Sequence, residues 1–179
     1  MTGLSFTTVE SDAEENAPRS LPPDEYVKVL SYQKAKAVQN RFPESCIIGA
    51  DTIVYLNNEI IGKPKNTEDA KNTLSKMQGN QHVVYTGITV LTKDKEITAF
   101  DTTNVTFSHM SKEEIDWYVS TGEPMDKAGS YGVQGPGGIF VQKIEGNYFN
   151  VVGLPLPLLY NMLVDAGVLI NGLNIKTDE

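Results

Sequence analysis

The sequence predicts an α/β protein with a mixed, elongated central sheet flanked by helices. Segments rich in β-branched and aromatic residues predict the strands, chiefly at 46–56, 82–91 and 96–107. Segments with apolar residues at helical spacing predict the helices, chiefly at 24–40, 67–77 and 155–165. Because the two kinds of segment alternate along the chain, they are expected to pack as layers around one core. At 179 residues the chain is expected to form a single domain over residues 1–179.

The composition argues against several classes of protein. The formal net charge of −8 disfavours binding to nucleic acid polymers or anionic membranes, which need a basic surface. No apolar run approaches the roughly 20 residues of a membrane span, and no signal peptide is visible, so we expect a cytoplasmic location. The single cysteine, Cys46, excludes an internal disulfide and is predicted to be a small core residue. His82 and His109 are too far apart to form a helical metal pair.

The first helix is expected after a short strand over residues 4–9 and an acidic loop over residues 10–16. Asp24 stands at the expected N-cap, so the helix is predicted from about Asp24 to Asn40. Its apolar stripe consists of Tyr26, Val27, Leu30, Ala37 and Val38. Lys34 lies on or near this stripe, which makes it a candidate functional residue. A lysine in such a place can also lay its stem on the core and reach solvent.

The stretch from Cys46 to Pro64 predicts a hairpin with a carboxylate in its first, buried strand. A carboxylate there costs several kcal/mol unless it is paired, bound to a metal or facing a cleft, so Asp51 needs a reason. Asn57-Asn58 predicts a tight turn, after which the return strand brings Lys63 back towards Asp51. An acid and a lysine at one end of a sheet suit a phosphate or metal-phosphate site. An ordinary buried ion pair explains the same residues equally well.

Three more elements complete the middle of the chain. A helix capped by Thr67 is predicted to run to about Met77. A long antiparallel hairpin follows, formed by residues 82–91 and 96–107. Ser111 begins the next helix, with Glu114 at the capping-box position, and Gly122 ends it.

The segment 122–138 contains six glycines and two prolines, so it is either a flexible linker or a shaped loop that approaches a ligand. Its polar side chains favour the loop, because a Gly/Ser spacer does not usually carry them. Among them, Gln134 presents both a donor and an acceptor, which suits the edge of a nucleotide base. A strand over residues 138–144 and a last helix over residues 155–165 follow. The tail after Gly167 is polar and is expected to fray.

Several stretches, in order along the chain, resemble one family. They are SDAEEN at 11–16, QKAKAV at 33–38, GADTIV at 49–54, IIGKP at 60–64, HVVYTGITV at 82–90, GEPMDKAGSYGVQG at 122–135 and NVVGLP at 150–155. The chain is therefore similar to the Maf-like nucleoside triphosphate pyrophosphatases over about residues 4–166. The resemblance implies a Maf/ITPase-like fold and hydrolysis of a nucleotide between its α- and β-phosphates.

The resemblance also implies a substrate, a cofactor and roles for individual residues. The DKAGSYGVQG form is similar to the branch that acts on dTTP and UTP, and modified pyrimidine nucleotides are further candidates. By position, Asp51 matches the acid that activates water, and Thr52 and Gln134 match specificity determinants. Glu15, Lys34 and Lys63 match polar residues of the same cleft. A divalent cation, Mg or Mn, is implied, with Glu15 and Asp51 as its expected ligands, and a homodimer is compatible with the family.

Family members begin with a strand and a Ser-Pro-Arg-Arg loop that binds phosphate, and this chain has no match to that piece. We therefore expect a domain that is N-terminally truncated relative to the family. Two alternatives to the active enzyme remain open at this stage. One is a catalytically impaired form that only binds nucleotides, and the other is a structural or interaction protein that uses its acidic and Gly-rich loops to contact a partner.

Overall fold

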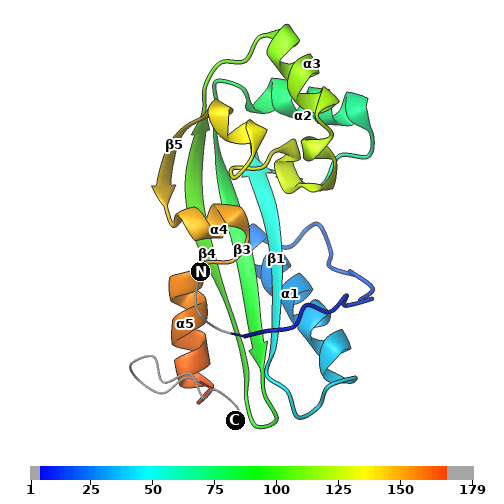
Figure 1. Cartoon of the computed structure of the whole chain (residues 1–179), viewed down its shortest axis with the longest axis vertical. Coiled ribbons are helices and arrows are strands. Elements are labelled where there is room, and N and C mark those ends of the chain that lie inside the picture. The colour runs from blue at the N-terminus through cyan, green and yellow to red at the C-terminus, as the bar shows by residue number, and fades with distance from the viewer. Residues whose placement is uncertain (1–4, 169–179) are drawn as a thin grey trace.

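The computed structural model of the chain, which describes residues 5–168, is an elongated α/β fold around one five-stranded sheet (Figure 1). The strands are β1 (Ile47–Leu56), β2 (Glu59–Ile61), β3 (Gln81–Leu91), β4 (Glu96–Phe107) and β5 (Val141–Gly146). Their order in the sheet is β2-β1-β3-β4-β5. The predicted fold class, a central sheet flanked by helices, is confirmed. Within the described residues all four pairings are antiparallel, so the expected mixture of strand directions is not found there.

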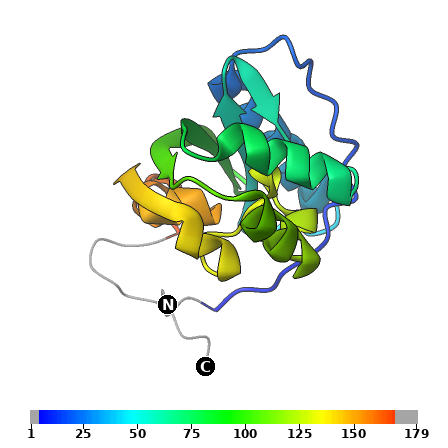
Figure 2. The same cartoon turned by 90° about the horizontal axis from the view of Figure 1, so that it is seen from above.

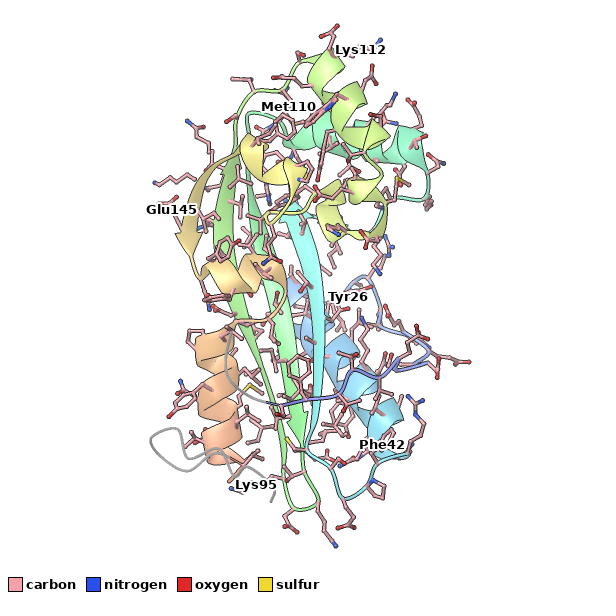
Figure 3. All side chains as sticks on the ribbon, viewed as in Figure 1. Tyr26, Phe42, Lys95, Met110, Lys112 and Glu145 are labelled. Atoms are coloured by element: carbon pink, nitrogen blue, oxygen red, sulfur yellow. The ribbon has the colours of Figure 1, made fainter. Side chains whose placement is uncertain are left out.

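Within the described part of the chain, five α-helices and three 3-10 turns surround the sheet (Figures 1 and 2). The helices are α1 (Pro23–Gln39), α2 (Thr67–Met77), α3 (Lys112–Ser120), α4 (Tyr148–Val152) and α5 (Leu156–Asp165), and the turns span Glu123–Asp126, Ala128–Ser130 and Pro136–Phe140. Helices α2 and α3 lie together at one end of the sheet, where Figure 3 labels Met110 and Lys112. No helix within residues 5–168 has the length and apolar character needed to cross a membrane.

Helices α1 and α5 cover opposite faces of the sheet. On β3, Ile88 and Val90 pack in one cluster with α5, whereas Leu91 packs with α1. This division follows from the pleat, because successive side chains of a strand point to opposite faces. A third and larger cluster, which includes the fully buried Tyr118, joins α2, α3 and the Gly-rich loop at the other end of the sheet.

Two glycines allow α1 to lie very close to the sheet. A Cβ atom on Gly49 of β1 would lie 2.4 Å from the carbonyl oxygen of Ser31. A Cβ atom on Gly87 of β3 would lie 2.3 Å from the carbonyl oxygen of Val27. Real Cβ atoms do not approach backbone atoms so closely, so only glycine fits at these two positions. The close approach also brings Lys34 of α1 within reach of Asp51 in the middle of β1.

Several local expectations are confirmed. Both predicted hairpins are present, with β1 paired to β2 and β3 paired to β4. The capping box of α3 is present, with Ser111 and Glu114 bonded to each other's backbone. The expected stripe of α1 is partly correct: Val27, Leu30 and Val38 are buried, but Ala35 is buried in place of Ala37.

Other expectations are wrong, each for a physical reason. Residues 5–9 form no strand and are exposed, because no described strand pairs with them. Cys46 is exposed rather than in the core, since it precedes the first residue of β1. Residues 136–140 form a 3-10 turn, so the strand expected over 138–144 begins only at Val141.

Two helix starts differ as well. Asn66 rather than Thr67 caps α2. Asp24 lies inside the first turn of α1 instead of capping it, because Pro22 and Pro23 already set the entry of the chain. From residue 169 on, the polar tail lies outside the described residues.

Candidate functional site

A cleft of about 740 Å³ opens along β1, between α1 and the Gly-rich loop. Its walls come from four parts of the chain: the segment before α1 together with α1, the β1–β2 hairpin, the loop from Glu123 to Gly135, and the end of α4. All six predicted site residues line it: Glu15, Lys34, Asp51, Thr52, Lys63 and Gln134. The fold therefore brings together residues that lie up to 119 positions apart (134 − 15 = 119) in the sequence.

Asp51 and Glu15 both pair with Lys34. Lys34 Nζ lies 2.5 Å from Asp51 Oδ1 and 3.1 Å from Glu15 Oε1. The Asp51 side chain is only 10% exposed, against 52% for Glu15. The charged end of Lys34 therefore bridges the nearly buried Asp51 and the solvated Glu15. The ammonium group of Lys34 compensates the cost of placing the Asp51 carboxylate in β1.

Burial and the neighbouring charges perturb both members of the inner pair. Burial raises the pKa of Asp51 above its ordinary value, and the negative Glu15 adds to this, although Lys34 and Lys63 act in the opposite direction. For Lys34, burial alone would lower the pKa, but hydrogen bonds and charges from Asp51 and Glu15 outweigh it and raise the pKa. A carboxyl group with a raised pKa takes up a proton more readily than a solvated one.

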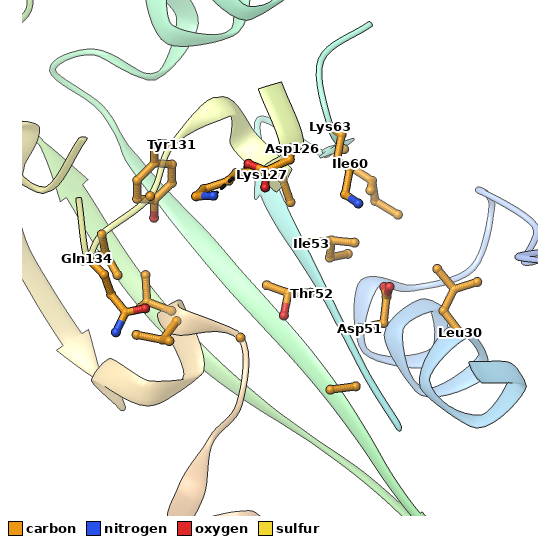
Figure 4. Close-up of a pocket in the computed structure, with 18 of the residues that line it drawn as sticks. Leu30, Asp51, Thr52, Ile53, Ile60, Lys63, Asp126, Lys127, Tyr131 and Gln134 are labelled. Carbon is orange, nitrogen blue, oxygen red and sulfur yellow. Dashed lines mark hydrogen bonds and ion pairs between the residues drawn. The ribbon is translucent and has the colours of Figure 1, made fainter. Parts of the chain in front are cut away.

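The remaining predicted residues are spread across the cleft. In Figure 4, Asp51 lies on the side nearest Leu30 of α1, Gln134 lies on the opposite side and Thr52 lies between them. Lys63 is exposed at the end of the hairpin, near enough to Asp51 to influence its pKa. The four predicted residues that are charged, Glu15, Lys34, Asp51 and Lys63, thus form what we call the charged end of the cleft, and the amide of Gln134 lies on the opposite side. The role of each residue stays a prediction.

Buried hydrogen bonds shape the Gly-rich loop. The Tyr118 hydroxyl donates to Glu123 Oε2 at 2.6 Å and accepts from the backbone N–H of Gly132 at 3.0 Å. Glu123 Oε2 also accepts from the N–H of Gly137 at 2.9 Å. These bonds hold the backbone on both sides of Gln134, so the segment is a shaped loop and not a flexible linker.

Among the polar and charged residues that line the cleft, sequence reasoning missed Arg19, Tyr26 and Glu123. Glu123 stands inside the GEPMDK stretch, where a carboxylate among glycines was a usable signal. Arg19 and Tyr26 had no such signal, because only the packing of the N-terminal segment and α1 against β1 brings them to the cleft. Asp126, Lys127 and Tyr131, which are among the polar side chains of the segment 122–138, also line it.

The carboxylates suit a hard divalent cation. Within residues 5–168 no group of three or more His, Cys, Asp or Glu residues is arranged to hold a metal ion. Glu15 and Asp51 nevertheless converge on one cationic group, the Lys34 ammonium. Mg²⁺ is commonly held by one or two carboxylates together with substrate phosphates, so this pair of oxygen donors fits it.

Taken together, the sheet, the polar cleft along β1 and the shaped loop define an α/β protein whose cleft is of a size that suits a small ligand. The chain belongs to the Maf-like family, because a family model described as "Maf-like protein" matches residues 1–166. Curated relatives agree. A protein of Bacillus cytotoxicus named "dTTP/UTP pyrophosphatase" is 45% identical over 163 residues, covering 91% of this chain and 85% of the relative. A relative of the same name from Bacillus cereus strain ATCC 10987 is also 45% identical, covering 91% and 80%.

Proposed function

We propose that this protein hydrolyses dTTP and UTP to the nucleoside monophosphate and pyrophosphate, with Asp51 as the proton acceptor. The observation that carries the proposal is the nearly buried Asp51 beside Lys34 at one end of a cleft whose other end carries Gln134. The names of the relatives support the substrates. The oxygen of a water molecule bonds to one of the two phosphorus atoms, the bond from that phosphorus to the bridging oxygen breaks, one proton of the water passes to Asp51, and pyrophosphate leaves.

The charged end of the cleft suits this reaction. The raised pKa of Asp51 brings its basicity closer to that needed to accept a proton from water near neutral pH. Lys34 and Lys63 offset the negative charge of the phosphates. Glu15 and Asp51 would hold a Mg or Mn ion, and that ion, when bound, would supply a Lewis acid beside the phosphates. Since Lys34 bridges both acids, its ammonium must shift when the cation binds.

Base selection is assigned to the opposite end. Gln134 has an exposed amide able to donate and accept at the edge of a pyrimidine, and modified pyrimidine nucleotides belong to the same proposal. Gln134→Ala should reduce the preference for UTP and dTTP over purine triphosphates by about tenfold, because it removes bonds to the base and none to the phosphates. Steady-state kinetics on UTP, dTTP, ATP and GTP measure this, and equal losses on all four would contradict it.

One observation favours a second candidate, a nucleotide-binding protein without turnover. The 2.5 Å bond from Lys34 occupies an oxygen of Asp51, as in an ordinary buried ion pair. Pyrophosphate release from UTP or dTTP with Mg²⁺ or Mn²⁺ separates the two candidates. If nucleotides raise the melting temperature but no pyrophosphate appears, binding without catalysis stands. If neither occurs, an interaction role gains. A cytoplasmic location and a homodimer remain predictions, to be checked by fractionation and by mass in solution.

A further inference from the structure

Behind the cleft, Thr52 is bonded to a row of buried polar groups that the proposed reaction does not use. Thr52 and Thr86 stand opposite each other on β1 and β3, with 2.9 Å between their hydroxyl oxygens. Thr86 is fully buried, and its hydroxyl oxygen lies 3.0 Å from the backbone carbonyl oxygen of Asn150 in α4. The row leads from the wall of the cleft to the interior of the sheet.

Asn150 anchors the inner end of this row. Its side chain is fully buried, and Nδ2 donates to the carbonyl oxygen of Val84 at 3.0 Å and to Thr103 Oγ1 at 3.1 Å. A carbonyl oxygen only accepts, so the bond to Val84 fixes which way the amide of Asn150 faces. Because these bonds join α4 to β3 and β4, the backbone carbonyl of Asn150 is held in place next to Thr86.

The bonding pattern determines where the hydroxyl protons lie. The carbonyl oxygen of Asn150 has no proton, so Thr86 must donate to it; otherwise two oxygens with facing lone pairs would stand 3.0 Å apart. This carbonyl also accepts from the N–H of Gly153, which its two lone pairs permit. With its single proton used, Thr86 can only accept from Thr52. The proton of Thr52 therefore points away from the cleft.

We propose that Thr86 and Asn150 are positioning residues that fix Thr52 as a hydrogen-bond acceptor towards the cleft, where it selects the N3–H group of uracil or thymine. This inference rests on the proposed function. Uracil and thymine carry a proton at N3 and cytosine carries a lone pair there, so a fixed acceptor attracts the first two and repels the third. A sugar hydroxyl both donates and accepts, so a fixed polarity would not discriminate it.

The surroundings of Thr52 agree with a contact to the base. Thr52 lies between Asp51 and Gln134 in Figure 4, on the way from the charged end to the amide. A Cβ atom on Gly153, which also lines the cleft, would lie 3.3 Å from Thr52 Oγ1. A glycine at this position leaves the lone pairs of Thr52 accessible.

The test compares Thr86→Val, which removes the hydroxyl at similar size, with Thr86→Ser, which keeps it. The readout is the ratio of kcat/KM for UTP to that for CTP, measured with Mg²⁺. Thr86→Val frees the proton of Thr52 to face cytosine, so the ratio should fall about tenfold. Thr86→Ser should keep it within about twofold of the unmodified protein. In a Thr52→Val background, Thr86→Val should change the ratio no further, because Thr86 acts only through Thr52.

The inference is overturned if folded Thr86→Val leaves the ratio unchanged. It is also overturned if Thr86→Val lowers the ratio as much in the Thr52→Val background as in the unmodified protein. Should Thr86→Val fail to fold, Thr52→Val alone decides: it removes the acceptor and must lower the ratio. Thr52→Val could instead change the ratio of kcat/KM for UTP to that for 3′-deoxy-UTP and leave the ratio of UTP to CTP unchanged. That result would assign Thr52 to the sugar and would also overturn the inference. An unmodified protein that hydrolyses no nucleotide removes the proposed function itself, whereas an active one with unchanged ratios removes only the inference about Thr52.

Discussion

Asp51, the acid of the cleft, is surrounded by neighbouring protein groups and has little contact with solvent. Asp51 is 10% exposed, burial raises its pKa, and its nearest charge is Lys34. These features combine the two properties a general base needs, a fixed position and a basicity nearer to neutral pH. Glu15 is more than half exposed, so in the proposed reaction it would serve only as a metal ligand, whereas Asp51 would also accept the proton.

The first residue-scale prediction concerns Asp51→Asn. An amide of the same shape cannot take a proton from water, so pyrophosphate release should fall by about 10²-fold or more. The fold should persist, which circular dichroism and the melting temperature check. Undiminished release would remove Asp51 from its role, and a collapse in stability would favour the buried ion pair.

The second residue-scale prediction concerns Lys34→Met and pH. A base works only when deprotonated, so kcat/KM should fall as the pH drops through the pKa of Asp51. Since Lys34 lowers that pKa, removing its charge should move the acidic limb of the profile to higher pH. Lys36→Met is the control, because Lys36 lies on the same helix and pairs instead with Glu96 at the surface. An acidic limb that stays in place in Lys34→Met would contradict the assignment.

At the scale of elements, the contact of α1 with the sheet sets the distance between Lys34 and Asp51. Gly49→Ala should destabilise the fold by about 1–3 kcal/mol, because the added methyl group would overlap backbone atoms of α1. Chemical denaturation measures this free energy of unfolding. Gly62→Ala is the matched control, since a Cβ atom there would meet nothing within 4 Å. If the two variants were equally stable, close packing of α1 would not be what places Lys34.

At the scale of the whole molecule, His82 links stability to pH. It is buried between β3 and the Gly-rich loop, with Nε2 lying 2.9 Å from the hydroxyl of Tyr131. Burial lowers its pKa from 6.5 to about 4, so the unfolded chain binds a proton more readily than the folded one. The stability associated with neutral His82 is therefore complete above pH 6.5 and is lost as the pH falls towards about 4.

The lowered pKa of His82 predicts that His82→Gln loses less stability than the unmodified protein when the pH falls from 7 to 4. The difference should be on the order of 3 kcal/mol, since one unit of pKa corresponds to about 1.4 kcal/mol. Denaturation curves at several pH values measure it. His109→Gln, altered at an exposed histidine, should keep the pH dependence of the unmodified protein. Identical pH dependence in all three proteins would contradict the assignment to His82.

Features that depend on local order along the chain could be predicted from its residues alone. Apolar runs rich in β-branched and aromatic residues, with turn residues between them, predicted both hairpins, and the capping box predicted the start of α3, because these patterns act over a few residues. Motifs in register along the chain predicted the family and six residues that line one cleft. The 3-10 turns of the Gly-rich loop escaped prediction, because glycine permits many backbone conformations and favours none.

Features that depend on contacts between distant segments could be seen only in the folded protein. The bond from Lys34 to Asp51 requires α1 to lie against β1, which two glycines on different strands permit. The hydrogen bonds of Tyr118 and Glu123 that shape the Gly-rich loop depend on partners from other elements, and so does the direction of the Thr52 proton. Each such bond is specific to a geometry that no local pattern encodes, because it joins residues of different elements, most of them far apart in the sequence.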